Sequence, residues 1–501
     1  MTNPVPPDQG PPDRPLVYAP VGLSGLAIVF NIEHQPSPIA PPDKRQLDGQ
    51  RFTSMKLTPR LVAKLLTQSY RQAVAGYPTI TPEYLKNNPL GLTGDPEFLE
   101  LNPDYRDFAF FTTPSDALVE LGGSDLTLLL WSWVKADRAA SEFLAGTPDE
   151  HGMVVNPNNK DLALPTSGFP RNDQSCADIP VGNGVTGRTC TLDIHPFTND
   201  MHDAGLSASR GDSLGRLPDG LGLLKKVDRQ LPAQRALLAV VDAATANRYG
   251  LPTAELRNSA EQFIAPTTAS LLAGAAAMQP SAVAGVRVSD PGAADPAAYP
   301  LTALSYAATA PSILDAAAGK EYAAFLRYAA GPGQQPGVGP GQLPFGMAPL
   351  PDELKAQTIA AAATIEAQAG KSAPGAPAPQ PASPGAIPGA AAGGAAGTTG
   401  SPSGTAGAGG TATSAGGATA VPPAGVAAQA AGGPAVKAPG VAQQPAAAVR
   451  RTPSLPASAV GGLLMAILIC GALAATSSPV MRPLAAAVQR RARKGVTPTD
   501  R

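Results

Sequence analysis

The sequence predicts an α/β domain, followed by a disordered stalk and one transmembrane helix. Three observations along the 501 residues support this organisation. Strand and helix patterns alternate as far as Gly370, which is typical of an α/β domain. The composition then changes abruptly to Ala, Gly and Pro, and a single long apolar segment follows this tract.

The α/β domain is expected to span residues 16–370. The preceding residues 1–15 are polar and Pro-rich, so we expect them to be disordered, and they lack the charged and apolar regions of a signal peptide. An apolar, β-rich run, LVYAPVGLSGLAIVFNI, opens the domain at Leu16. We expect its Gly-Leu-Ser-Gly stretch, residues 22–25, to form a turn that divides the run.

Local signals also indicate two helices. The segment Leu57–Tyr70 has apolar residues at helical spacing, with Thr58 as its expected N-cap and Pro59 in its first turn. Trp131 and Trp133 lie in the second helical pattern. Because residues two positions apart point to different sides of a helix, we expect only one of these indoles to face the core.

The tract over residues 371–450 consists almost entirely of small residues and proline. Such a composition offers too little large apolar surface to offset the entropy lost on ordering, so we expect a disordered linker. Residues 456–479 then supply about 20 mostly apolar residues, enough to cross a bilayer, and we expect a transmembrane helix there. The alternative, a buried helix of a soluble domain, is disfavoured because the neighbouring tract offers nothing to bury it.

Charge predicts the orientation of this helix. The segment 480–501 carries more basic residues than the sequence just before the helix, where Arg450 and Arg451 lie. The positive-inside rule therefore places the basic tail in the cytoplasm and the large domain outside. A tail-anchored protein with its domain in the cytoplasm is the alternative, which the missing signal peptide would allow. The whole chain has a net charge of −1, so we expect no nucleic-acid partner.

Two of the three cysteines are placed to form a disulfide. Cys176 and Cys190 flank a polar, Gly-rich stretch, and a loop of this length would gain roughly 3 kcal/mol from cross-linking in the chain-entropy model. We expect the disulfide because we place the domain outside the cell, where disulfides persist. Two free thiols are the alternative.

Several segments taken together resemble the phosphate-binding members of the periplasmic solute-binding protein family, which have the type 2 periplasmic-binding-protein fold. Their order over roughly residues 16–330 carries the resemblance. The segments are VYAPVGLSGLAIVFNI with LTPRLVAKLLTQSY, Asn102–Asp137, Leu256–Met278 and Ala298–Ala310. The resemblance implies two α/β lobes that close on an oxyanion, phosphate as the ligand and an ABC permease as a partner. It also implies that the N-terminal part of the first lobe is missing.

The turn GGSDLT is the expected ligand site. A Gly-rich turn at the start of a helix directs backbone N–H groups and the positive end of the helix dipole at one point, which suits an anion. We therefore expect oxyanion-binding residues, which are Gly123, Ser124, Asp125 and Thr127. The alternative is that Ser124 or Asp125 only caps the helix. Glu120 stands where the family has an arginine that pairs with the oxyanion, and a carboxylate there would repel phosphate.

These features predict a membrane-tethered, extracytoplasmic protein that resembles a solute-binding protein and takes part in phosphate uptake or sensing. The alternative is a surface scaffold or interaction module whose ligand site has degenerated. We expect no enzymatic activity, no cofactor and no metal. Asp193, His195, Asp200, His202 and Asp203 could form a zinc site, but their spacing fits no helical metal motif and an ordinary polar loop is favoured.

Overall fold

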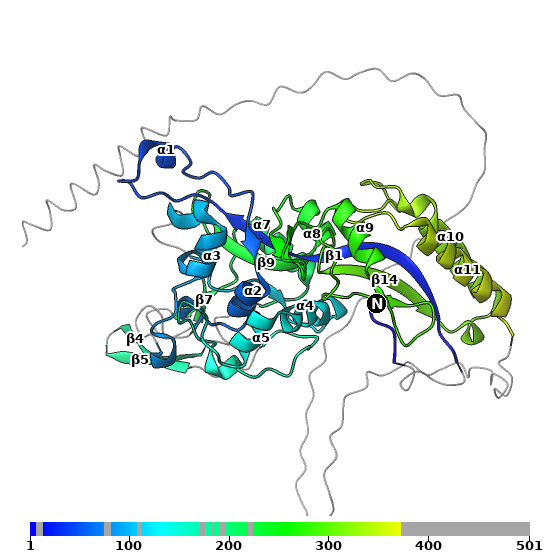
Figure 1. The fold of residues 1–501 in the computed structure, drawn as a ribbon, viewed down its shortest axis with the longest axis horizontal. Helices are drawn as coiled ribbons and strands as arrows, with labels where there is room; N and C mark the ends of the chain where they lie inside the picture. Colours follow the sequence, from blue (N-terminus) through cyan, green and yellow to red (C-terminus); the bar gives the residue numbers. More distant parts are fainter. Residues whose placement is uncertain are drawn as a thin grey trace, which may run out of the picture. The chain divides into compact units, whose positions relative to one another are not determined.

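The first 370 residues form a mixed α/β structure, as predicted, in the computed structural model of the chain (Figure 1). The structure describes residues 1–6, 14–74, 82–107, 113–170, 176–182, 184–190, 197–218 and 224–371. The predicted linker beyond Lys371, the transmembrane segment 456–479 and the basic tail 480–501 lie outside the described residues. Within the described part of the chain, every helix is too short or too polar to cross a membrane.

The elements alternate along the chain. The strands are β1 (Val17–Ile32), β2 (Lys56–Leu57), β3 (Val119–Glu120), β4 (Cys176–Gly182), β5 (Val185–Cys190), β6 (Phe197–Thr198), β7 (Arg216–Pro218), β8 (Leu224–Lys226), β9 (Ala236–Asp242), β10 (Glu255–Arg257), β11 (Phe263–Ile264), β12 (Gln279–Pro280), β13 (Arg287–Val288) and β14 (Thr302–Thr309). The α-helices are α1 (Pro42–Arg45), α2 (Pro59–Leu66), α3 (Pro96–Leu101), α4 (Asp125–Ala136), α5 (Arg138–Leu144), α7 (Met201–Ser209), α8 (Ala243–Arg248), α9 (Thr268–Ala276), α10 (Ala316–Ala330) and α11 (Asp352–Gln368).

Strand β1 connects the two halves of the fold. Its first half, Val17–Gly25, pairs antiparallel with β14, and its second half, Leu26–Ile32, pairs antiparallel with β9. The expected turn at residues 22–25 is therefore wrong, because the strand continues through it with only a bulge between Pro20 and Gly22. A Cβ atom on Gly25 would lie 3.0–3.2 Å from Leu271, Tyr299 and the Leu301 carbonyl. Here glycine permits close packing rather than a turn.

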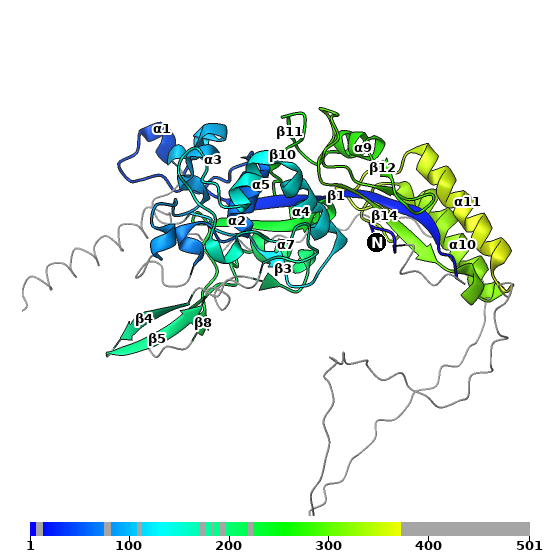
Figure 2. The ribbon, with the colours of Figure 1, turned by 60° about the horizontal axis from the view of Figure 1, so that its bottom comes forward.

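Two hydrophobic clusters pack against β1. The larger one surrounds most of the strand and includes α2, α4 and β9. The smaller one lies where Ala19 of β1 packs against helices α10 and α11 (Figure 2). Small residues let these two helices approach closely, since a Cβ on Gly319 of α10 would lie 2.2 Å from the Cβ of Ala369. The Gly370 N–H then donates to the Leu314 carbonyl at 2.8 Å, which fixes the end of α11.

Helix α2 begins where the sequence predicts, because the Thr58 hydroxyl accepts a hydrogen bond from the Leu61 N–H at 3.1 Å. The prediction for α4 is wrong in one respect: Trp131 and Trp133 are both buried. Each indole N–H reaches a backbone carbonyl, of Gly168 at 3.1 Å and of Arg257 at 3.0 Å. The two indoles thus lie at the two margins of one wide buried face, with Leu130 and Val134 between them, whereas Lys135 and Ala136 are exposed.

The predicted disulfide is present. Cys176 and Cys190 are paired opposite each other at the open end of the β4–β5 hairpin and are joined by a disulfide bond. The hairpin lies at the margin of the described domain, away from α10 and α11 (Figure 2). Free thiols at these positions are therefore excluded by the structure.

Candidate functional site

The predicted oxyanion turn has the expected strand, turn and helix arrangement. Strand β3 ends at Glu120, and α4 begins at Asp125. Ser124 is the N-cap of α4, and its hydroxyl accepts from the Thr127 N–H at 3.1 Å. The Ser124 N–H donates to the Ser167 carbonyl at 2.8 Å. Two of the backbone donors at this turn are thus used within the chain.

Glu120 lies directly behind the turn and is 8 % exposed. Its carboxylate accepts hydrogen bonds from the hydroxyl of Ser124 and, at 2.9 Å, from the hydroxyl of Thr127. These are the two hydroxyl groups that the resemblance assigns to an oxyanion. Both hydroxyl groups therefore have an acceptor within the chain.

The other two predicted residues have different roles. Gly123 lies close to Ser167, whose Oγ would be 2.9 Å from a Cβ at this position. The Asp125 carboxylate points outward, where its Oδ2 accepts from the backbone N–H groups of Thr2 at 2.8 Å and Asn3 at 3.0 Å. Residues 1–15 were expected to be disordered, but the described residues 1–6 are hydrogen-bonded to the domain.

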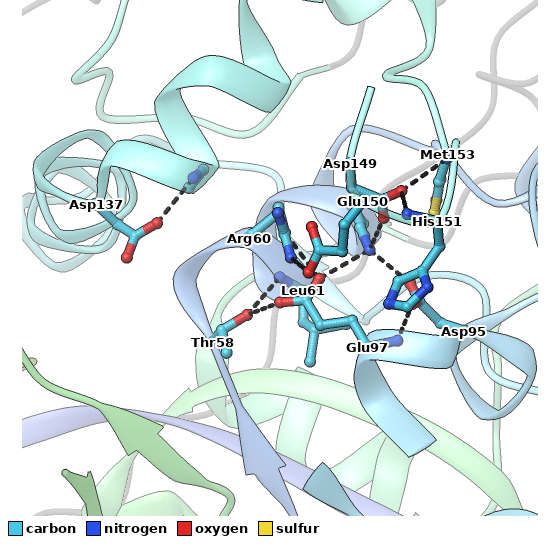
Figure 3. A network of polar contacts seen from close by, with 12 residues as sticks. Thr58, Arg60, Leu61, Asp95, Glu97, Asp137, Asp149, Glu150, His151 and Met153 are labelled. Carbon is cyan, nitrogen blue, oxygen red and sulfur yellow. Dashed lines mark hydrogen bonds and ion pairs between the residues drawn. The ribbon is translucent and has the colours of Figure 1, made fainter. Parts of the chain in front are cut away.

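A second polar cluster surrounds Lys64, whose side chain has no solvent exposure. Figure 3 shows Arg60, Asp95, Glu97 and Asp149 of this cluster. Its Nζ lies 2.9 Å from Asp95 Oδ2, 2.9 Å from Glu97 Oε2 and 2.7 Å from Asp149 Oδ2. Oxygen atoms of these three carboxyl groups lie within 4.8 Å of one another, as they would around a metal ion. The lysine ammonium takes the cation position in this cage.

Further donors and charges complete the cluster. The Tyr70 hydroxyl donates to Asp95 at 2.9 Å, and the Thr58 hydroxyl donates to Glu97 at 2.6 Å. Arg60 bridges Glu97 at 2.9 Å and Glu150 at 2.6 Å. The cluster therefore joins α2, the start of α3 and the turn that begins at Asp149.

The charges in this cluster alter several pKa values. Burial disfavours the charged form of Lys64, but the charges of Asp95 and Glu97 outweigh burial and raise the pKa of the lysine. Burial would raise the pKa of Glu97, but the Lys64 charge and the Thr58 hydroxyl hold it below its usual 4.5. The hydrogen bond from Arg60 lowers the pKa of Glu150 to about 2. All three groups are therefore ionised near neutral pH.

Sequence reasoning missed this cluster. Lys64 is separated by 31 and 33 residues from Asp95 and Glu97, so no local motif brings them together. One signal was available, because Lys64 interrupts the apolar pattern of α2, in which it is flanked by Ala63 and Leu65. A lysine buried in such a helix needs charged partners elsewhere in the fold.

A pocket of about 610 Å³ also lies between α8 and the loop over residues 337–345, with both apolar and polar residues in its lining. Among these residues, His202 Nε2 lies 2.8 Å from the Tyr249 hydroxyl. Asp200 and Asp203 of the candidate zinc set lie at the start of α7, where Asp200 is the N-cap. His195 and Asp193 lie outside the described residues.

No protein-family model matches the chain, and no curated protein sequence matches it either.

Proposed function

We propose that the described domain is a non-catalytic interaction module of a membrane-tethered, extracytoplasmic protein. The observation that carries this proposal is the position of Glu120, whose carboxylate accepts from the hydroxyls of Ser124 and Thr127. A phosphate at the same turn would lose these two donors and would lie beside a buried negative charge. The turn is thus better suited to holding the domain together than to capturing an anion.

The tethered, extracytoplasmic part of the proposal draws on two further features. The apolar segment 456–479 and the basic residues that follow it favour a single membrane crossing with the domain outside. The disulfide between Cys176 and Cys190 favours an oxidising compartment. Both features favour a domain that lies outside the cytoplasm.

The alternative function is phosphate binding for uptake or sensing, with delivery to an ABC permease. The strand, turn and helix arrangement at Ser124 favours it, because a helix N-terminus attracts anions. It requires the Glu120 carboxylate to move away when phosphate binds. The two functions therefore make opposite predictions for a phosphate titration.

Isothermal titration calorimetry of the full chain with inorganic phosphate distinguishes the two functions. We expect no phosphate-dependent heat from the natural chain. Glu120→Ala removes the internal acceptor and frees both hydroxyls, so this variant is expected to show weak phosphate binding. Glu83→Ala is the matched control, because the Glu83 side chain is 83 % exposed. Saturable phosphate binding by the natural chain would reject the interaction module in favour of the alternative.

A further inference from the structure

The pocket between α8 and the loop over residues 337–345 has two helices in its wall. Its volume of about 610 Å³ lies in the range of small-molecule sites. His202 of α7 and Arg248 of α8 both line it. A Cβ atom on Gly205 of α7 would lie 2.5 Å from Thr245 Cγ2, so glycine lets α7 pack directly on α8. The relative position of His202 and Arg248 is therefore set by the packing of two helices.

The loop that completes the pocket is anchored at both ends. At its start, the Gly337 N–H donates to the Leu343 carbonyl at 2.9 Å. Just beyond its end, a Cβ on Gly346 would lie 2.2 Å from the Ala243 carbonyl oxygen of α8. These contacts hold Phe345 beside the pocket, and this residue is 55 % exposed. An aromatic side chain with much of its apolar surface uncovered thus lines the pocket.

The polar side chains at the pocket favour an anionic ligand. Arg248 is exposed, and among the described residues its side chain has no hydrogen-bond or ion-pair partner. None of the described residues that line the pocket is acidic. In a second pocket, at the start of α5, Arg257 is by contrast already paired with Asp137 and Glu261. The guanidinium of Arg248 therefore has its N–H donors available for a ligand.

We infer that this pocket binds a small organic carboxylate, with Arg248 holding the carboxylate and Phe345 in contact with an apolar body. A planar guanidinium pairs with both oxygens of a carboxylate, and an aromatic side chain offers a large apolar contact surface. The pocket accommodates far more than an inorganic anion, which is why an apolar body is expected on the ligand. This site goes beyond the proposed interaction module and does not involve the turn at Ser124.

Photolabelling of the full chain with 4-benzoylbenzoate tests the inference. This probe joins a carboxylate to an aromatic body, and under ultraviolet light its ketone attaches to a nearby C–H bond. Trypsin releases the loop within the peptide Tyr328–Lys355, in which mass spectrometry measures the label. We expect labelling that is half-saturated at or below about 1 mM probe. The uncharged amide of the probe should need at least about tenfold more, because it lacks the charge-assisted hydrogen bonds.

Two substituted positions separate the charge from the apolar contact. Arg248→Gln should raise the half-saturating concentration of the carboxylate about tenfold, whereas Arg248→Lys keeps the charge and should raise it less. Phe345→Ala should weaken labelling by the carboxylate and by the amide alike. The matched control is Arg138→Gln, at a side chain that is 90 % exposed and lines the second pocket, and this variant should label like the natural chain.

Labelling of the peptide Tyr328–Lys355 that does not saturate would overturn the inference, and so would equal labelling of the natural chain and Arg248→Gln. Arg248 is exposed, so this variant should keep the melting temperature of the natural chain. If it does not fold, the comparison of carboxylate and amide on the natural chain decides, and equal labelling by both probes would overturn the inference.

Competition separates this site from a general anion site. Unlabelled 2-naphthoate should displace the probe, whereas inorganic phosphate at the same concentration should not, because it has no apolar body. Equal displacement by both would overturn the inference. Phosphate binding at the turn of Ser124 would reject the interaction module and leave the labelling of Tyr328–Lys355 unchanged. The two proposals can therefore fail separately.

Discussion

The positively charged side chain of Lys64 is fully buried, with no solvent exposure. Three carboxyl groups, two hydroxyl groups and Arg60 surround this position in one network. Such a buried network contributes little over apolar residues of the same volume, but removing one partner leaves uncompensated charge in a place of low polarity. The network therefore links α2, α3 and the turn at Asp149 in one defined arrangement.

Removing this lysine should strongly destabilise the domain. We expect Lys64→Ala to lower the free energy of unfolding by about 3–5 kcal/mol, because three carboxyl groups then lose their shared partner. Chemical denaturation measures the change, and Lys86→Ala, at a lysine whose side chain is 55 % exposed, is the control and should stay within about 0.5 kcal/mol. A loss below about 1 kcal/mol for Lys64→Ala would contradict the predicted role.

The same variant offers a second measurement. The vacated position is bounded by carboxyl oxygens, the ligands that Ca²⁺ prefers. Millimolar Ca²⁺ should therefore raise the melting temperature of Lys64→Ala and leave that of the natural chain unchanged. An equal response in both proteins would show that the lysine does not stand in the place of a cation.

The pH dependence of the free energy of unfolding should reflect the ionisation of Glu97. Its pKa in the folded protein lies below 4.5, so its stabilising effect is present above that pH and is lost as the pH falls through the lowered pKa. The pKa of Lys64 is raised, so the effect of pH is reversed for this group. The stability that the Lys64 charge contributes is lost only as the pH rises above 10.5. Between pH 5 and neutrality both contributions are therefore retained.

Glu97→Gln tests this pH dependence. The variant should be less stable than the natural chain at pH 7, and the difference should shrink as the pH falls below 4.5, when measured by urea denaturation at several pH values. Glu150→Gln is a useful comparison, because Glu150 has a pKa of about 2 but a half-exposed side chain, so its effect should be smaller. Parallel stability curves for Glu97→Gln and the natural chain would refute this assignment.

At the level of single residues, the sequence was informative wherever the interaction was local. Thr58 caps α2 as predicted, because the N-cap hydroxyl and the N–H group that donates to it are only three residues apart. The partners of Lys64 and the bonds from residues 1–6 to Asp125 depend on the folding of distant segments, and the contact between Glu120 and Thr127 depends on the turn between them. These could not be read from residue order, although Glu120 was already recognised as unfavourable for an anion.

At the level of elements, the predictions for β1 and α4 were wrong for physical reasons. Gly22 and Gly25 were expected to make a turn, but close packing against neighbouring side chains explains them inside a continuous strand. Trp131 and Trp133 were assigned to different sides of a helix, whereas the buried face of α4 is wide enough to include both. Residues two positions apart can both be buried when the apolar face of a helix is this wide.

The β4–β5 hairpin should depend on its disulfide. Cross-linking this short loop is worth about 3 kcal/mol in the chain-entropy model, and the hairpin makes its contribution locally. In the double variant Cys176→Ser/Cys190→Ser, trypsin should cleave faster after Arg188, whose side chain is 68 % exposed, while the melting temperature changes little. Peptide mapping of timed digests follows this cleavage. Unchanged cleavage at Arg188 would show that strand pairing alone holds the hairpin.

At the level of the whole molecule, the alternation of strand and helix patterns predicted the mixed α/β structure of the first 370 residues. Helix α11, at Asp352–Gln368, is the last element that the structure describes. The type 2 binding-protein fold, the linker and the membrane helix remain predictions, because they depend on a resemblance or on segments outside the described residues.

The orientation of the molecule can be tested in cells that produce the full chain. Protease added to intact cells should degrade the described domain and leave a fragment that contains residues 456–501, because we place the domain outside the membrane. Immunoblotting with antibodies against each end follows both parts, and a cytoplasmic marker protein controls for lysis. Survival of the domain under these conditions would favour the cytoplasmic alternative.

The docking of α11 determines where mechanical load would enter the domain. A pull on the chain beyond Lys371 first reaches the bond between Gly370 and Leu314 and the close contact between Ala369 and Gly319. Behind these contacts, α11 packs on α10 and on β1, and β1 runs through both halves of the fold. Tension would therefore detach α11 before it strained β1. The rest of the domain would stay folded while the C-terminal helix was pulled away.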